Sequence, residues 1–165
     1  CTCKKIARNK IALFHLRPGV RSTVNELDFL IARIVELLSE LTFPPKFTFG
    51  VDELGNSYFL ENEVVWHVVL DAVAELELYK YLNNLDSIFC AAAVAVYCAL
   101  QELATGRFIN IEFGGEVYSK LYDKLLEHLQ KNSLVPHLLA HWDKYKSLTR
   151  TRLMQICRIS TTTSS

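Results

Sequence analysis

Hydrophobic and polar positions are interspersed along most of the chain, but one stretch has no strongly polar positions. Between residues 88 and 100 no side chain is charged or strongly polar, and the run is rich in alanine, the best helix former. A helix that is apolar on every face must be buried on every face. Residues 88–103 would form a rod of about 24 Å, and a membrane span needs about 20 apolar residues. We therefore expect a buried central helix here and no stable membrane span.

Apolar positions spaced by three and four predict further helices on both sides of this stretch. Before it, residues 23–41 and 62–82 carry such stripes, and Thr23 and Glu26 have the spacing of a capping box. After it, residues 116–131 and 134–148 form amphipathic patterns, and a basic piece follows over residues 149–159. Pro44 and Pro45 end the first of these helices, and Gly106 is suited to end the central one.

Residues 43–60 are rich in aromatic side chains among prolines and glycines, and they allow two structures. Either they form a loop that packs its aromatic rings on the core, or residues 46–51 and 56–60 pair as a short hairpin around residues 52–55. Residues 108–115 read as a loop.

Together these patterns predict an all-α fold, a single-domain bundle of six to eight helices around a buried central hydrophobic helix. The domain proper is expected over residues 22–159. Residues 1–21 are expected to be a basic, partly ordered N-terminal arm, and residues 160–165 a disordered tail.

Charge gives no strong argument for nucleic acid as a partner. The 165 residues carry 18 basic and 18 acidic groups and a formal net charge of zero. The ends of the chain are basic and the middle is acidic, because residues 50–103 hold a single basic residue, Lys80, against nine acidic ones. A nucleic-acid-binding domain would show a net basic face.

No residue pattern identifies a reaction, so we expect no enzyme, no cofactor and no metal site. His137 and His141 lie four residues apart, a spacing that can hold a metal, but no third ligand accompanies them. Cys90 and Cys98 lie within the most apolar stretch, where a free cysteine behaves as a small hydrophobe. This placement favours a reducing compartment.

Recognition of another helix is the function that remains. A helical bundle can leave a surface groove that accepts an amphipathic partner helix. The candidate walls lie on the helix that precedes the central one: Val69, Val73, Leu76 and Tyr79. The alternative is that these four side chains belong to the ordinary core.

Three segments, in order, resemble the B-cell lymphoma two (Bcl) family of apoptosis regulators. Residues 25–30 resemble the fourth homology segment, and residues 88–103 stand where that family has its central helix. Residues 134–139, followed by Trp142, Asp143 and Tyr145, are similar to the second homology segment. The chain departs from the family at residues 84–88, which lack the arginine that pairs with an aspartate of the bound helix.

The resemblance implies a regulator of apoptosis, similar to viral members of the family, that sequesters an amphipathic helix of a pro-apoptotic protein. It implies a cytoplasmic location, in a host cell for a viral protein, and it leaves room for a homodimer. It adds five positions to the candidate partner-binding residues: Leu85, Asp86, Phe89, Trp142 and Tyr145.

Two other classes remain open. Chain length, Cys1 and Cys98 are similar to a type I interferon, a secreted helical cytokine in which a Cys1–Cys98 disulfide would be expected. The third interpretation is a helical subunit of a larger assembly.

Overall fold

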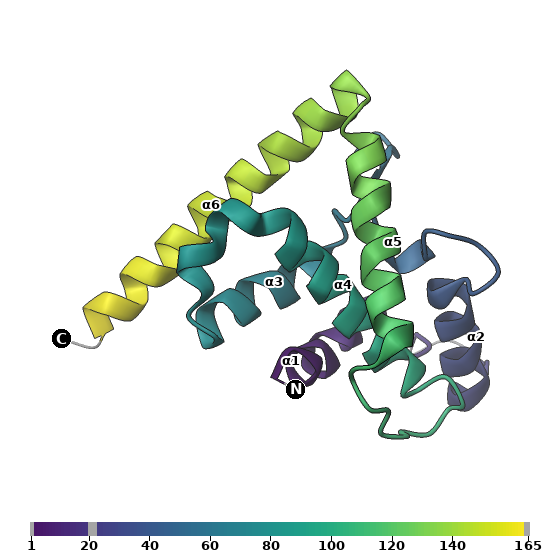
Figure 1. Ribbon diagram of the computed structural model, residues 1–165. Helices are drawn as coiled ribbons and strands as arrows, with labels where there is room; N and C mark the ends of the chain where they lie inside the picture. The colour runs from purple at the N-terminus through teal and green to yellow at the C-terminus, as the bar shows by residue number, and fades with distance from the viewer. Residues whose placement is uncertain (1, 20–22, 164–165) are drawn as a thin grey trace.

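The apolar stretch forms the helix α4 (Leu85–Gln101), which lies at the centre of the computed structural model (Figure 1). The structure describes residues 2–19 and 23–163. α4 contacts α1 (Thr2–Lys10), α2 (Glu26–Leu38), α3 (Glu63–Glu75) and α5 (Glu116–Asn132). The all-α fold and the buried central helix are therefore confirmed.

By length and composition alone, Leu78–Gln101 would also qualify as a membrane span. Packing explains its apolar character without a membrane, because most side chains of α4 are buried against the neighbouring helices. Within the apolar run of α4, Ala91 is an exception and is exposed.

The N-terminal segment is a helix, so the prediction of a partly ordered arm over residues 1–21 is wrong for most of its length. α1 covers α3 and α4, and the short 3-10 helix η1 (Ile11–Phe14) continues it. Ile6, Ala7, Ile11 and Phe14 are buried. Residues 1 and 20–22 lie outside the described part of the chain.

The next segment contains α2 and a small hairpin. α2 begins two residues later than the capping-box pattern predicts, because Asn25 rather than Thr23 caps it by accepting a hydrogen bond from the Leu27 amide at 2.8 Å. After the 3-10 helix η2 (Lys46–Thr48), β1 (Phe49–Val51) and β2 (Ser57–Phe59) pair antiparallel, with Phe49 opposite Phe59. The hairpin alternative is thus confirmed.

Gly50 in β1 sits where a side chain cannot. A Cβ atom there would lie 1.9 Å from the carbonyl oxygen of Glu61. This close approach brings the hairpin against the start of α3, where Asn62 caps the helix and donates a hydrogen bond to the Phe49 carbonyl at 3.1 Å.

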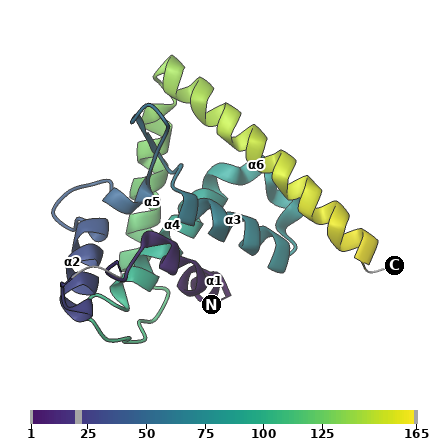
Figure 2. The same ribbon diagram turned by 180° about the vertical axis from the view of Figure 1, so that it is seen from behind.

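The helix predicted over residues 62–82 is two elements. α3 ends at Glu75, and after Glu77, which has a positive φ of 53°, the chain forms the 3-10 helix η3 (Leu78–Asn84). The helix predicted over residues 134–148 and the basic piece after it, residues 149–159, conversely form one helix, α6 (Pro136–Thr163). α6 runs across α3 and extends beyond the body of the domain (Figures 1 and 2). It includes residues 160–163, so the disordered tail predicted from residue 160 is wrong for those four positions.

Candidate functional site

The structure brings together four of the predicted partner-binding residues, but as an internal contact. Phe89 of α4 packs edge-on against Trp142 of α6 with ring centroids 5.1 Å apart, and Tyr145 lies 5.8 Å from Phe89. The Trp142 indole donates a hydrogen bond to Asp86 at 2.9 Å. These residues attach α6 to the start of α4.

Most of the other predicted groove residues are core. Val69 and Val73 of α3 are fully buried, and Leu85 is 1% exposed. Tyr79 is half-buried, and Leu76, 42% exposed, is the most accessible of the predicted walls. The groove predicted from α3 and the start of α4 is therefore wrong in its position, because α1, α4 and α6 of the chain itself cover α3.

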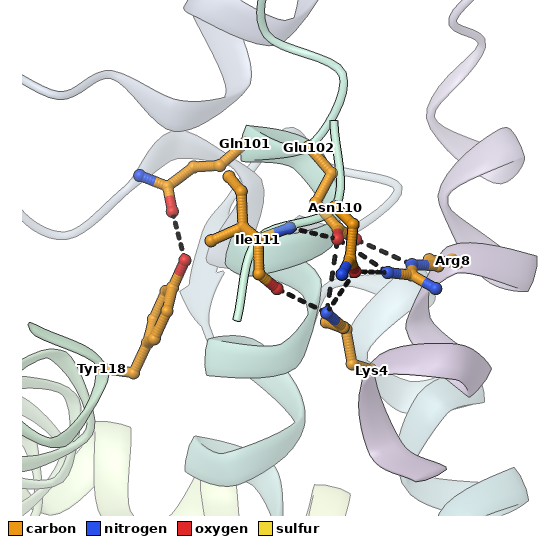
Figure 3. Close-up of polar contacts among 7 residues, drawn as sticks. All are labelled: Lys4, Arg8, Gln101, Glu102, Asn110, Ile111 and Tyr118. Carbon is orange, nitrogen blue, oxygen red and sulfur yellow. Dashed lines mark hydrogen bonds and ion pairs between the residues drawn. The ribbon is translucent and has the colours of Figure 1, made fainter. Parts of the chain in front are cut away.

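A buried ion cluster joins α1 to the end of α4 (Figure 3). Glu102, the C-cap residue of α4, is 1% exposed. Arg8 binds both of its carboxylate oxygens, Nε to Oε1 at 2.8 Å and Nη2 to Oε2 at 2.7 Å, and Lys4 Nζ lies 3.3 Å from Oε2. The backbone amide of Ile111 donates to the same carboxylate at 2.9 Å.

Asn110 completes the cluster from the loop that follows α4. Its side-chain oxygen accepts hydrogen bonds from Lys4 at 3.1 Å and from Arg8 at 2.7 Å, and the Ile111 carbonyl also accepts one from Lys4. The cluster thus fastens three segments at one point: α1, the end of α4, and the loop at residues 110–111 (Figure 3).

The protonation state of the cluster is set by its contacts. Burial alone would raise the pKa of Glu102, but the hydrogen bonds from Arg8, the Ile111 amide and Lys4 outweigh burial and lower this pKa to about 2. Glu102 is therefore ionised at neutral pH. Its lone pairs are occupied by donors, so it acts as an anchor for α1 rather than as a proton acceptor for chemistry.

The sequence analysis did not identify this cluster. A signal for it exists at Glu102, which ends a long apolar helix and would be costly to bury without a partner. Lys4 and Arg8 lie one helical turn apart on a segment that carries apolar residues between them, Ile6 and Ala7. These two observations point to a buried cation–carboxylate contact, although they do not show which carboxylate and cations meet.

Beside the cluster lies an open cleft of about 940 Å³ between η1 and α2. Half of its lining is apolar: Ile11, Ala12, Leu16, Leu27, Leu30 and Leu103. The polar half contains three basic side chains, Arg8, His15 and Arg17, and one acidic side chain, Glu26. The cleft therefore combines apolar walls with a basic rim.

The two arginines of this rim differ in the hydrogen bonds and ion pairs that they form. Arg8 is 32% exposed at its side chain and is held by Glu102 and Asn110. Arg17 is exposed and makes no hydrogen bond or ion pair with any described residue. Arg17 can therefore accept an anionic partner without breaking a contact within the described part of the chain.

The α2 wall of the cleft depends on a glycine. Gly106 has a φ of 85°, and a Cβ atom there would lie 2.3 Å from Leu27 Cδ1. Because Gly106 lacks that atom, the turn after α4 can pack directly under α2. Both walls of the cleft thus contact the end of α4. The wall formed by α1 and η1 does so through the ion cluster, and the α2 wall does so through Gly106.

A second set of titratable groups lies at the start of α3. His141 Nδ1 lies 2.9 Å from Glu61 Oε2, and the Tyr58 ring stacks on the imidazole at 3.6 Å between centroids. Burial raises the pKa of Glu61, and His141 opposes this effect. The adjoining pocket, about 340 Å³, offers no serine or cysteine nucleophile in its described lining.

In the described residues no group of three or more His, Cys, Asp or Glu side chains could hold a metal ion.

The cysteines bear on the cytokine alternative. Cys98 is a free, fully buried thiol, and burial raises its pKa. Cys90 is buried and free as well, with a pKa that burial raises to about 12. Cys1, the other end of the expected Cys1–Cys98 disulfide, lies outside the described residues.

Comparison with known proteins identifies a family for the chain. A family model described as a domain of unknown function, DUF6532, matches residues 2–132. No curated protein and no solved structure matches the chain. The family match contains the ion cluster and the cleft and ends before α6.

Proposed function

The chain belongs to the DUF6532 family of domains of unknown function, and from the geometry of the cleft between η1 and α2 we propose that the domain binds an amphipathic helix of a partner protein. One observation carries this proposal: the cleft combines apolar walls with an arginine at its rim, Arg17, that makes no hydrogen bond or ion pair with any described residue. The partner helix would place its apolar face on the walls and an acidic residue opposite Arg17.

The apolar walls suit the side chains of a helix. Leu27 remains 47% exposed although it belongs to the apolar face of α2, and Leu30 and Leu103 lie in the same lining. An amphipathic helix presents apolar residues at positions i, i+3, i+4 and i+7 along one face. Burying such residues against Leu27 would remove apolar area of both proteins from water, at about 25 cal/mol per Å².

The basic rim supports an acidic residue in the partner. Arg17 has no ion pair with any described residue, whereas the charge of Arg8 is already paired with Glu102, so Arg17 is the rim cation that could pair with an acidic residue of the partner. The resemblance described above calls for an arginine at the start of the central helix, where this chain has none. On our proposal Arg17 takes that role from the segment between η1 and α2.

Contacts that hold the two sides of the cleft in place support tight binding, because less ordering is then needed when the partner arrives. The wall at α1 is held by the buried contacts of Glu102 with Arg8 and Lys4. The wall at α2 rests on Gly106. A partner would therefore meet a preformed surface.

The resemblance supports a pro-apoptotic protein as the partner, and with it a regulator of apoptosis that acts in the cytoplasm. This part of the proposal rests on residues 25–30 and 88–103 of the family pattern, both of which lie within the matched domain. Residues 25–27 and Leu30 also line the cleft.

The experiment is a calorimetric titration of the full chain with helical peptides from pro-apoptotic proteins. We expect at least one peptide to bind with a dissociation constant below about 10 µM, equivalent to about −7 kcal/mol. Replacing the aspartate of that peptide by asparagine should weaken binding about tenfold or more, as expected for the loss of a charged contact. If no peptide binds at this level, the proposed function is wrong.

Matched charge reversals locate the site. Arg17→Glu should weaken the best peptide about tenfold or more, whereas Arg152→Glu on the exposed face of α6 makes the same change in net charge and should leave binding unchanged. Equal effects of the two variants would show a nonspecific charge effect and would exclude this cleft as the binding site.

A further inference from the structure

A separate pocket of about 350 Å³ lies against α4 at its exposed position, Ala91. Residues of α1, α4 and α5 and of the loop before α5 line it, among them Cys3, Ala91, Phe113, Tyr118, Tyr122 and Asp123. Small-molecule sites begin at about 300 Å³, so the pocket suits a small group. It lies apart from the cleft, with which it shares no lining residue.

Three aromatic rings form the walls of this pocket. Phe113 and Tyr118 lie 5.7 Å apart between centroids with an angle of 34° between their planes, and Tyr122 adds a half-buried ring one helical turn further along α5. The Tyr118 hydroxyl donates a hydrogen bond to Gln101 at 2.8 Å, which holds its ring in place (Figure 3). The faces of aromatic rings carry partial negative charge.

The base of the pocket is made of small residues. Ala91 contributes a single methyl group, and a Cβ atom at Gly114 or Gly115 would meet nothing within 4 Å. The backbone at these two glycines therefore borders open space. Burial raises the pKa of the Cys3 thiol, so this group stays neutral at physiological pH.

The electrostatics of this pocket differ from those of the cleft. Its described lining contains no lysine, arginine or histidine, whereas the cleft between η1 and α2 and the pocket beside His141 each contain at least one. Asp123 supplies a carboxylate that makes no ion pair with any described residue. Aromatic faces together with an unpaired carboxylate attract a cation and repel an anion.

We propose that this pocket binds a methylated ammonium group, held by the rings of Phe113, Tyr118 and Tyr122 and by the charge of Asp123. Aromatic pockets with this composition recognise quaternary ammonium ions, because the methyl groups fill the apolar space while the charge interacts with the ring faces. A primary ammonium would lose more hydration on entering. A free quaternary ammonium compound and the side chain of a methylated lysine share this chemistry.

The direct test compares a cation with its neutral analogue of the same shape. Choline and 3,3-dimethyl-1-butanol differ only in the replacement of the charged nitrogen by carbon. In calorimetric or NMR titrations of the full chain, we expect choline to bind about fivefold to thirtyfold more tightly than the alcohol. Equal affinity would show a merely apolar pocket, and absence of choline binding would show no site; either result overturns the proposal.

A third titration distinguishes the two sources of the ligand. A short peptide with trimethyllysine that binds more tightly than choline, while the unmethylated peptide does not bind, would assign the pocket to a protein partner. Choline binding that exceeds that of the peptide would assign it to a free ammonium compound.

Two variants of Tyr122 distinguish a direct role of its ring in choline binding from an effect on folding. Tyr122→Phe keeps the ring and should retain choline binding, whereas Tyr122→Leu removes the ring and should weaken it about fivefold or more. Asp123→Asn should weaken choline binding and make it less sensitive to salt. Thermal melting of each variant checks that it folds. Retention of the choline preference in Tyr122→Leu and in Asp123→Asn would overturn the proposal.

Discussion

Arg8 and Glu102 lie 94 residues apart in the sequence and form a two-point ion pair, with nitrogen–oxygen distances of 2.8 Å and 2.7 Å. Parallel contacts of this kind are among the strongest hydrogen-bonded interactions in proteins. The pair connects α1 to the C-cap residue of the central helix α4.

Removal of this carboxylate should destabilise the fold. In Glu102→Gln the amide leaves the ammonium of Lys4, which is 9% exposed at its side chain, without its counter-charge. Breaking a buried pair by removing one partner typically costs about 3–5 kcal/mol. Urea denaturation followed by circular dichroism measures the free energy of unfolding.

The matched control is Glu127→Gln, which removes the carboxylate of the exposed Lys131–Glu127 pair on α5. Exposed pairs of this kind contribute little, so its unfolding midpoint should equal that of the wild type. If both variants had the same midpoint, the cluster would not be the anchor of α1.

Because of the same carboxylate, the free energy of unfolding should depend on pH in the acid range. The pKa of Glu102 is lowered to about 2 in the folded state, while that of an unfolded glutamate is about 4.3. Over this range the unfolded state binds more protons, so stability rises with pH. The contribution of Glu102, about 3 kcal/mol by linkage, is fully present above about pH 5 and is lost as the pH falls toward 2.

Denaturant titrations at several pH values test this window. The difference in unfolding free energy between wild type and Glu102→Gln should be constant from pH 7 to about pH 5 and should shrink below it. A difference that does not change between pH 5 and pH 3 would contradict the lowered pKa.

The central helix could be predicted because its signal is local. An unbroken apolar run specifies burial on every face whatever surrounds it, and Cys98, Val96 and Leu100 are indeed fully buried. The start of the helix predicted from residue 62 was similarly local, because its apolar stripe begins at Val64, and α3 begins at Glu63. The hairpin over residues 49–59 was one of two alternatives, and the sequence does not show how closely β1 approaches Glu61.

Other features depend on partners that are distant in the sequence. α1 has a polar composition, and its burial is made less costly by Glu102, which pairs with both Lys4 and Arg8. The predicted groove failed for a related reason: Val69 and Val73 have the pattern of an apolar face, and the pattern does not show that other parts of the same chain cover that face. The cleft between η1 and α2 arises from the placement of α1, so it could not be predicted before that helix was.

Gly106 is expected to tolerate no side chain. In Gly106→Ala the new methyl group would meet Leu27 Cδ1, and alanine is strained at a φ of 85°. We expect a loss of about 1–3 kcal/mol in unfolding free energy. The double variant Gly106→Ala with Leu27→Ala should lose less than the sum of the two single variants, because truncating Leu27 removes the clash but not the backbone strain. Strict additivity would show that the contact with Leu27 is unimportant.

Trp142 separates the two candidate locations for partner binding. Trp142→Phe should cost about 1 kcal/mol of unfolding free energy, because it removes the hydrogen bond to Asp86. Trp142→Ala should cost about 3–5 kcal/mol, because it also leaves a cavity beside Phe89.

If partners bind in the cleft between η1 and α2, Trp142→Phe leaves peptide affinity unchanged while Arg17→Glu lowers it. Loss of affinity in Trp142→Phe, with no change in Arg17→Glu, would place the binding surface at the contact between α4 and α6, and would mean that α6 must move away from α4 before a partner helix can bind.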